Sequence, residues 1–389
     1  MNILFCRYRN MCEPDYIEAF KALGVNVIEV FINEFEKEPL EKKVEILSAK
    51  VIENSPIFVF TINYFPYISI ICQAMQVKYV SVSVTCPVME IYNVTIRNKC
   101  NRLFLFDYEQ YLSVKDENPD CIFYLPLGAA VERVDTLLGD CDKYLYDVSF
   151  VGSLYSEKDP FLNLKISDEK RLYFEDILKK QIGITATGQD YVEEKITDED
   201  IAYIKSSAKD FYSSEMSVRN LDRFVAINNY LAPHMTYLER VEILNNIAQK
   251  LKGYKLHFFT QSDISTLKNV VCHGGVDTLQ EMPFVFRQSK VNLNFSTRSI
   301  KSGIPQRVWD VLACGGFLLT NYQTELDDFF EVGKHLAVYE EDAEIPDKIE
   351  YYLVHEDERM EIANEGCLQV KRMGAILQRV IEMIKVISR

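Results

Sequence analysis

The sequence lacks several features that mark specialised classes of protein. Its 389 residues include only 15 glycines and 12 prolines, which leaves no room for a large disordered or low-complexity part. No apolar run reaches the roughly 18 residues of a membrane-spanning helix, and the charged N-terminus does not match a signal peptide. We therefore expect a folded, cytoplasmic protein with no transmembrane segment.

The sequence also has no cluster of metal-binding residues and no excess of positive charge. The ten cysteines are scattered singly, without a Cys-x-x-Cys pair or a group with any of the five histidines. We expect reduced, structural thiols and no metal site. The 43 basic and 58 acidic residues give a formal net charge of −15, which argues against nucleic-acid binding. A small anionic ligand remains compatible with local arginines and lysines.

In the first third of the chain, short apolar runs alternate with helical patterns. This alternation is typical of a doubly wound parallel sheet. A long charged helix is expected over about 34–55. The expected strands are Asn2–Cys6, Asn26–Phe31, Ile57–Ile62, Tyr79–Val84, Leu103–Phe106 and Ile122–Leu125.

The alternation starts again in the second part of the chain. A helical insertion at about 156–250 follows its first strand, and Thr236 is expected to cap the last helix of this insertion. The expected strands are Tyr146–Ser153, Lys255–Thr260, Val270–His273, Val291–Phe295, Phe317–Asn321 and His335–Val338. We predict an α/β protein with two Rossmann-like domains, 1–142 and 143–370, and a C-terminal helix at 371–389 that packs back toward the first domain.

A polar loop followed by a helix is the most informative stretch of the sequence. The loop carries Arg298 and Lys301, and Ser302-Gly303 opens the helix. The free N–H groups and the dipole of such a helix start bind phosphate, and nearby cations add charge-assisted hydrogen bonds. The stretch therefore predicts a site for a diphosphate.

The same helix carries Arg307 and Asp310, three residues apart. Asp310 lies about a turn and a half into the helix, where its carboxylate could accept hydrogen bonds from a ribose. The alternative is that the two residues form only an ion pair on the helix surface. The spacing alone leaves both interpretations open.

This helix and the turn after it read Arg307-Val-Trp-Asp-Val-Leu-Ala-Cys-Gly-Gly-Phe-Leu-Leu-Thr-Asn. The run resembles the donor-site signature of GT-B glycosyltransferases of the group 1 or family 4 type. The resemblance extends to Phe150-Val-Gly-Ser-Leu-Tyr and Tyr124-Leu-Pro-Leu-Gly, and is greatest with the spore-maturation-protein-like branch, which has an N-terminal domain of unknown function. It implies the GT-B fold, with two facing Rossmann-like domains, and a nucleotide diphosphate sugar as donor substrate.

The resemblance also implies roles for residues of the donor site. An acidic residue before the Ala-x-Gly turn holds the ribose in the family, and this role falls to Asp310. Many relatives carry a glutamate eight residues earlier, where this chain has Ser302. Lys301 and Arg307 would act as catalytic residues that stabilise the leaving diphosphate, without a cofactor or a metal. The predicted donor contacts are Gly152, Ser153, Tyr155, Gly275, Asp277, Met282, Arg298, Ser302, Gly303 and Asp310.

The N-terminal domain is expected to bind the acceptor at the carboxyl ends of its strands. Glu13 is the first choice for a catalytic base, although Glu13-Pro14-Asp15 is also a typical helix start. Relatives often carry an aspartate where this chain has Thr85. The predicted acceptor-side residues are Arg7, Asp15, Asn63 and Thr85, and Asp107 lies at a further strand end.

The predicted function is transfer of a sugar from a nucleotide diphosphate sugar to a hydroxyl of a glycan, protein or small molecule. Two alternatives stay open. One is a sugar-nucleotide epimerase on the same architecture. The other is an inactive transferase-like binding partner in a glycosylation complex, which the departures at Ser302 and Thr85 keep open.

Overall fold

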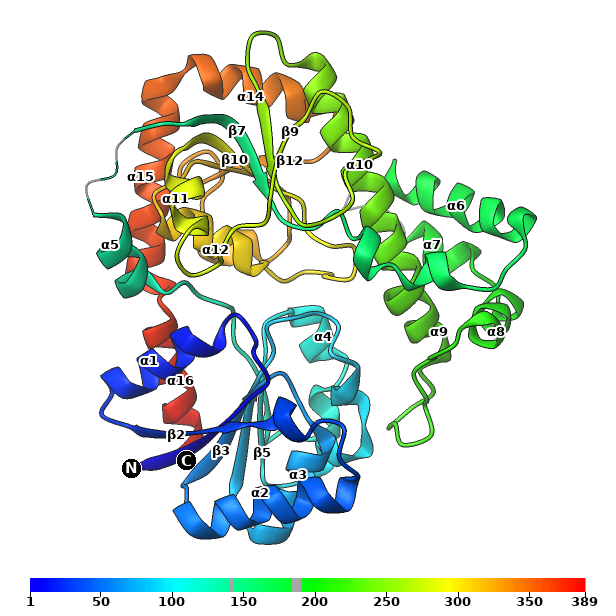
Figure 1. The fold of residues 1–389 in the computed structure, drawn as a ribbon, viewed down its shortest axis with the longest axis vertical. Coiled ribbons are helices and arrows are strands. Elements are labelled where there is room, and N and C mark those ends of the chain that lie inside the picture. The colour runs from blue at the N-terminus through cyan, green and yellow to red at the C-terminus, as the bar shows by residue number, and fades with distance from the viewer. Residues whose placement is uncertain (140, 142, 184–189, 389) are drawn as a thin grey trace. The chain divides into compact units, whose positions relative to one another are not determined.

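The computed structural model describes residues 1–139, 141, 143–183 and 190–388, which form two compact units, each built on a six-stranded parallel sheet (Figure 1). The N-terminal unit consists of Met1–Arg133, Lys301–Trp309 and Val370–Arg389, and the C-terminal unit of Val134–Ile300 and Asp310–Gln369. Two segments from the second half of the chain therefore belong to the N-terminal unit.

The N-terminal sheet has the strand order β2-β1-β3-β4-β5-β6, and every neighbouring pair is parallel. The chain runs outward from β1 to β2 and returns on the other side of β1 with β3. The topological switch point, where ligands bind in such sheets, therefore lies between β1 and β3. The strands are β1 (Asn2–Arg7), β2 (Asn26–Phe31), β3 (Phe58–Ile62), β4 (Lys78–Val82), β5 (Asn101–Leu105) and β6 (Ile122–Tyr124).

Helices cover the N-terminal sheet. On one face, Phe5 and Phe60 pack in a core with residues of α1 (Glu13–Ala22) and of α16 (Ile376–Ile387) from the end of the chain. The expected helix over 34–55 is wrong at its start, because Pro39 lacks a backbone N–H and the helix begins after it. The other elements are η1 (Ile32–Phe35), α2 (Leu40–Asn54), α3 (Pro66–Met75), η2 (Met89–Tyr92), η3 (Val94–Arg97), α4 (Tyr108–Leu112) and η4 (Lys115–Glu117).

The C-terminal sheet has the strand order β12-β11-β10-β7-β8-β9, again with all pairs parallel. Its switch point lies between β7 and β10. Together the two sheets contain all twelve expected strands, which confirms the α/β prediction. The strands are β7 (Tyr146–Val151), β8 (Leu256–Phe259), β9 (Val271–His273), β10 (Ser289–Asn294), β11 (Leu318–Asn321) and β12 (Ala337–Tyr339).

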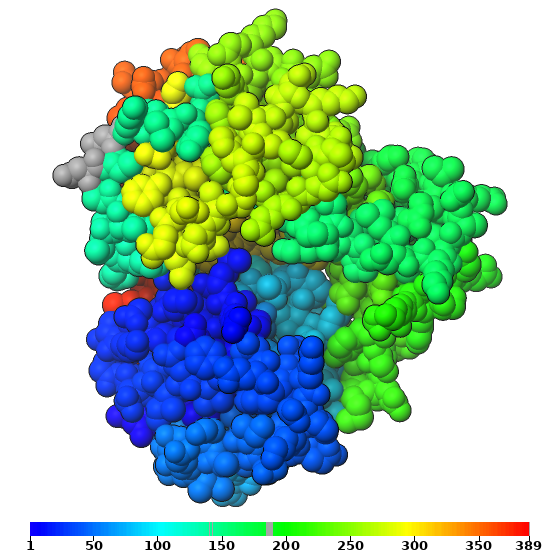
Figure 2. Space-filling view, viewed as in Figure 1, coloured from blue at the N-terminus to red at the C-terminus, as the bar shows by residue number. Residues whose placement is uncertain are grey.

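The chain between β7 and β8 forms a helical lobe at the side of the C-terminal unit, drawn in green in Figures 1 and 2. Pro233 lacks the N–H that an α-helical hydrogen bond needs, and the residues before α10 form a π-helix. Thr236 is not a cap, since its hydroxyl donates to the Ala232 carbonyl inside α10. The elements are η5 (Ser156–Lys158), η6 (Pro160–Asn163), α6 (Asp168–Ile182), α7 (Tyr191–Lys195), α8 (Asp198–Ser207), α9 (Asp222–Val225), η7 (Ala226–Leu231) and α10 (Ala232–Lys250).

The remaining helices connect and cover the sheets. The first part of α12 belongs to the N-terminal unit and its second part, from Asp310, to the C-terminal unit. No helix among the described residues is long and apolar enough to cross a membrane. The elements are α5 (Val131–Leu138), α11 (Met282–Arg287), α12 (Gln306–Ala313), α13 (Leu326–Phe329), η8 (Asp342–Glu344), α14 (Ile345–Val354) and α15 (Glu356–Met373).

Gly366 lets α15 approach the backbone before β12. A Cβ atom at this position would lie 2.2 Å from the carbonyl oxygen of His335. Because a backbone atom cannot move aside cheaply, Gly366→Ala should lower the free energy of unfolding by about 1–3 kcal/mol. Gly183→Ala is the matched control, since its new methyl group would meet no atom closer than 3.6 Å. Equal melting temperatures for the two variants would contradict this account of α15.

Candidate functional site

One arginine joins the carboxyl ends of β7 and β10 at the switch point of the C-terminal unit. Arg240 of α10 is only 6% exposed, and its guanidinium donates to the carbonyl oxygens of Ser153, at 2.6 Å, and Phe295. The guanidinium also lies over the ring of Tyr155, 5.0 Å from its centroid. Arg240 thereby fixes the loops that follow both strands. The sequence analysis missed it, because an arginine in the middle of a helix carries no motif.

The loop after β7 contains the predicted donor contacts Gly152, Ser153 and Tyr155. The Ser153 hydroxyl donates to the carboxylate of Glu157, whose other oxygen accepts from Ser262, after β8, at 2.8 Å. Burial raises the pKa of Glu157, but hydrogen bonds from Ser153, its own backbone and Ser262 outweigh it, so this pKa lies below its ordinary value. The glutamate therefore ties the loops after β7 and β8 together. Tyr155 has a left-handed backbone, with φ of 76°.

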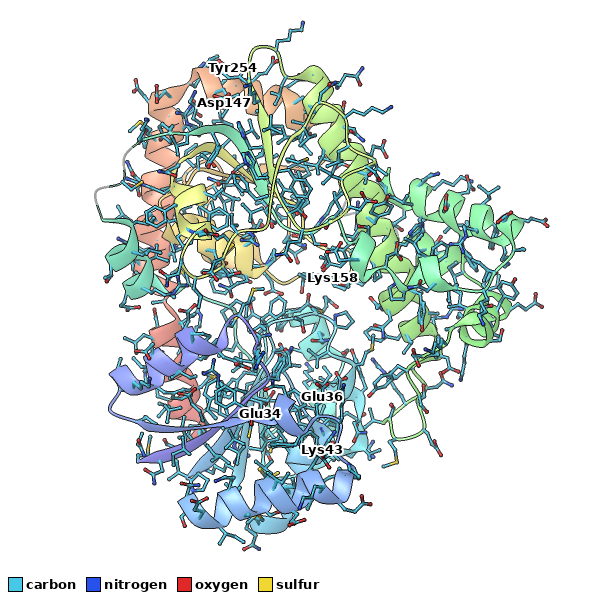
Figure 3. All side chains as sticks on the ribbon, in the orientation of Figure 1. Glu34, Glu36, Lys43, Asp147, Lys158 and Tyr254 are labelled. Atoms are coloured by element: carbon cyan, nitrogen blue, oxygen red, sulfur yellow. The ribbon has the colours of Figure 1, made fainter. Side chains whose placement is uncertain are left out.

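Lys158 is an exposed cation in the same loop. Its ammonium lies 5.6 Å from the ring centroid of Tyr155, and it forms no ion pair within the described part of the chain. Figure 3 shows Lys158 at one end of the C-terminal unit, with Asp147 and Tyr254 at the other. Asp147 belongs to the start of β7, so Lys158 lies on the carboxyl side of the sheet, where ligands bind in doubly wound folds.

Arg298, a predicted diphosphate contact, is paired with a carboxylate. Its Nε lies 2.9 Å from Oε2 of Glu239, and its Nη2 contacts the other oxygen. Asp342 of η8 is close enough to both to interact electrostatically. Burial and then the charge of Glu239 raise the pKa of Asp342 to about 7, although Arg298 acts in the opposite direction. Two acidic residues thus already surround the Arg298 charge.

The amides predicted to bind phosphate are bound instead by an aspartate. Oδ2 of Asp107, at the end of β5, accepts from the backbone N–H groups of Lys301, Ser302 and Gly303 at 2.9, 3.1 and 3.1 Å. The Ser302 hydroxyl accepts from the backbone N–H of Glu109. A buried set of amides needs an acceptor, and the carboxylate supplies it within the N-terminal unit.

Helix α12 begins only at Gln306, after Pro305, so the expectation that Ser302-Gly303 opens this helix is wrong. Lys301 is exposed, whereas Arg307 and Asp310 are half-buried, and both of these make interactions within the structure. The division between the units falls just before Asp310. The helix ends at Ala313, and Gly315 in the turn after it has a left-handed backbone, with φ of 67°, which favours glycine.

The loop after β9 holds the residues predicted near the nucleobase. Asp277 stabilises a turn, because its Oδ1 accepts from the backbone N–H groups of Leu279 and Gln280 at 3.0 and 2.7 Å. Gly275 is exposed, and Met282 is buried at the start of α11. The Asp277 side chain is therefore used within the loop itself.

The predicted base Glu13 is fully buried in the N-terminal unit. Its carboxylate accepts from Nε of Arg7 at 3.0 Å and from the backbone N–H of Tyr8 at 2.7 Å. It thus holds the end of β1 against the start of α1. Asp15 forms a two-point ion pair with Arg133, at 2.7 and 3.0 Å.

The other acceptor-side residues follow neighbouring strands. Asn63 comes after β3 and has a left-handed backbone, with φ of 55°, and its side chain bonds to Tyr8 and to the backbone of Val84. Thr85 is exposed beyond β4. The structure therefore brings Tyr8 and Asn63 together at the switch point. No group of three His, Cys, Asp or Glu side chains that could hold a metal occurs among the described residues.

Comparisons with known proteins agree with this architecture. Residues 240–384 match a family model described as glycosyl transferase-like. No curated protein sequence matches the chain.

Solved structures resemble the chain over its full length. The Anabaena protein HepE in complex with UDP and glucose has a TM-score of 0.56 and 9% identity, covering 100% of this chain and 99% of its own. Sucrose-phosphate synthase from Thermosynechococcus elongatus has a TM-score of 0.57 and 8% identity, covering 99% and 98%. A glycosyltransferase from Rickettsia africae has a TM-score of 0.52 and 12% identity, covering 100% and 98%. The fold is GT-B, as predicted.

Removing the charge of Asp107 should loosen the N-terminal unit. In Asp107→Asn, a neutral oxygen faces the three amides of residues 301–303, so the free energy of unfolding should fall by about 2–3 kcal/mol. Asp120→Asn is the control, because it removes the same charge from an exposed residue. Chemical denaturation measures both variants. If Asp107→Asn unfolds like the control, the carboxylate does not hold this segment.

The raised pKa of Asp342 predicts a pH dependence of stability. Between about pH 4 and pH 7 the folded protein keeps the Asp342 proton that the unfolded chain releases, so stability falls as the pH rises through this window. Asn cannot ionise, so Asp342→Asn should exceed the wild type in melting temperature at about pH 8 and lose this advantage at about pH 4. Melting curves of both proteins across this range make the comparison. Parallel pH profiles would show that Asp342 is not the group concerned.

Proposed function

We propose that the protein transfers a glycosyl group from a nucleoside diphosphate sugar to a hydroxyl of an acceptor. The observation that carries this proposal is the position of the family match. It begins at Arg240, the residue that joins β7 and β10 at the switch point, and it runs through β10 and α12. The match thus includes Arg240 and every strand of the C-terminal sheet except β7.

The donor is proposed to bind at the carboxyl ends of β7 and β10. The turn at Gly152 and Ser153 would contact the diphosphate, and Lys158 would supply positive charge. Asp310 would accept hydrogen bonds from the ribose. We choose uridine diphosphate as the first nucleotide to test, because HepE is described in complex with UDP and glucose.

Lys301 and Arg298 have smaller roles in this proposal than in the sequence-based prediction. Lys301 is exposed and belongs to the segment that Asp107 binds in the N-terminal unit, so the proposed donor site does not include it. Arg298 is compensated by Glu239 and serves mainly to shape the loop after β10. With Lys158 as the positive group, the proposed reaction needs no metal.

The chemical step breaks one bond and forms another. The bond between the anomeric carbon and the diphosphate oxygen breaks, and the diphosphate leaves with the electron pair. The acceptor oxygen forms the new bond to the anomeric carbon and loses its proton. We favour the leaving diphosphate over Glu13 as the proton acceptor, because Arg7 and the backbone of Tyr8 occupy the buried Glu13 carboxylate.

One observation favours a second candidate, an inactive protein that binds nucleotide sugars in a glycosylation complex. The amides before α12 are bound by Asp107, and Glu13 is buried. Such a protein would bind UDP-glucose without cleaving it. Release of UDP from UDP-glucose, with or without an added acceptor, separates the two candidates. We further propose, on the strength of the run that begins at Arg307, that the chain is related to the spore-maturation-protein-like branch. Its ten single cysteines support the proposal that it is cytoplasmic.

Asp310→Ala tests the donor site. UDP should raise the melting temperature of the wild type, since a ligand that binds only the native state stabilises it. Loss of hydrogen bonds to a charged group should weaken UDP binding about tenfold or more in the variant, as calorimetry would measure. Asp357→Ala, at an exposed position of α15, is the control and should bind UDP normally. Unchanged UDP affinity in Asp310→Ala would rule out this residue as the ribose ligand.

A further inference from the structure

The switch point of the N-terminal sheet has an organised set of polar and aromatic side chains. Tyr8 follows β1, Asn63 follows β3, and Val84 lies beyond β4. The Asn63 side chain donates to the Tyr8 hydroxyl and accepts from the backbone N–H of Val84. A single amide therefore joins the loops after three neighbouring strands, at the edge where parallel sheets bind ligands.

The orientation of two amides around Tyr8 is fixed by backbone donors. Oδ1 of Asn10 accepts from the backbone N–H of Cys12 at 2.9 Å, and Oδ1 of Asn63 accepts from that of Val84 at 3.0 Å. Each amide must then turn its NH₂ group in the other direction. Both NH₂ groups donate to the Tyr8 hydroxyl oxygen, at 3.0 and 3.1 Å.

Beyond these two bonds, the Tyr8 hydroxyl hydrogen has no acceptor among the described residues. A phenol oxygen accepts hydrogen bonds and donates one through its own hydrogen. Here the oxygen accepts twice, and no described residue accepts from it. Burial, partly offset by the hydrogen bond from Asn10, raises the pKa of Tyr8 to about 12, so the phenol stays protonated at neutral pH. Tyr8 is thus a hydrogen-bond donor in a fixed position.

The surroundings of Tyr8 suit the ring of a sugar. Phe65, after β3, packs edge-on against Tyr8 with the ring centroids 5.3 Å apart, and both side chains are half-buried. Arg9 and Asn63 both have left-handed backbones, with φ of 69° and 55°. Non-glycine residues persist in this conformation where the surrounding structure enforces it, as at binding sites. Aromatic rings and fixed hydrogen-bond donors are what a ligand with a C–H face and many hydroxyl oxygens requires.

We propose that Tyr8 donates a hydrogen bond to a hydroxyl oxygen of a sugar ring, which packs against Phe65, and that the acceptor of this protein is a saccharide. This inference rests on the proposed function, because it identifies the acceptor of the same reaction. The Asn10 and Asn63 amides position Tyr8, and Tyr8 and Phe65 touch the sugar.

Methyl glycosides of glucose, galactose and mannose are suitable probes. Saturation-transfer NMR on the full chain identifies which of them binds, and a titration gives its dissociation constant. Tyr8→Phe keeps the ring and removes the hydrogen-bond donor, so it should weaken the binding of that glycoside about tenfold. Tyr64→Phe is the matched control. It removes a hydroxyl that donates to Thr95 in the buried core, so it should lower the melting temperature and leave glycoside affinity unchanged.

Phe65→Leu provides a second variant, because Tyr8→Phe also leaves two amides without their acceptor. Phe65→Leu keeps the Tyr8 hydrogen bonds and removes the aromatic ring of residue 65, so it should weaken glycoside binding several-fold. The inference is overturned if no glycoside binds the wild type, or if both Tyr8→Phe and Phe65→Leu bind it as the wild type does. A parallel UDP titration reports on the proposed function by itself, because UDP affinity depends on the C-terminal unit and should be the same in all of these proteins.

Discussion

The Asp107 carboxylate decides where the chain goes after strand β10. Three consecutive backbone N–H groups, those of residues 301–303, donate to one carboxylate oxygen, whose negative charge favours this convergence of donors. Because Asp107 is buried at the end of β5, this segment must enter the N-terminal unit. Residue 303 fits there because glycine has no Cβ atom. A Cβ atom at this position would lie only 2.9 Å from the Phe106 ring. Helix α12 consequently starts in one unit and continues in the other.

This interaction changes which groups can supply positive charge to a ligand. The backbone N–H groups of residues 301–303 already donate to a carboxylate, so they are not available to a diphosphate. The other cations differ in how far they are compensated. Arg298 is paired with Glu239, and the buried Arg240 guanidinium donates to two carbonyl oxygens. Lys158 is exposed and forms no ion pair among the described residues, so the loop after β7 is the more favourable place for phosphate oxygens.

The sequence was sufficient for the sheets but not for these contacts. Each strand is a short apolar run with turn residues at its ends, a local pattern that survives folding. The starts of helices are harder to predict. The helix expected from residue 34 begins only after Pro39, and Thr236 lies inside α10, which continues a preceding helix, so Thr236 does not cap it. Asp107 and Lys301 are 194 residues apart, and no spacing rule links them. The ribose and nucleobase contacts remain predictions, since they depend on a ligand.

The two switch points solve the same physical problem with different side chains. Loops at the carboxyl ends of parallel strands have few backbone partners, so a polar side chain must fix them before they can recognise a ligand. In the C-terminal unit a long arginine reaches two carbonyl oxygens and leaves its charge near the ligand side. In the N-terminal unit the amide of Asn63 accepts from one loop and donates to another, which leaves no net charge. Because fixed loops lose less conformational entropy on binding, this difference supports the two ligands proposed above: an anion where the fixing group is cationic, and an uncharged, hydroxyl-rich molecule where it is neutral.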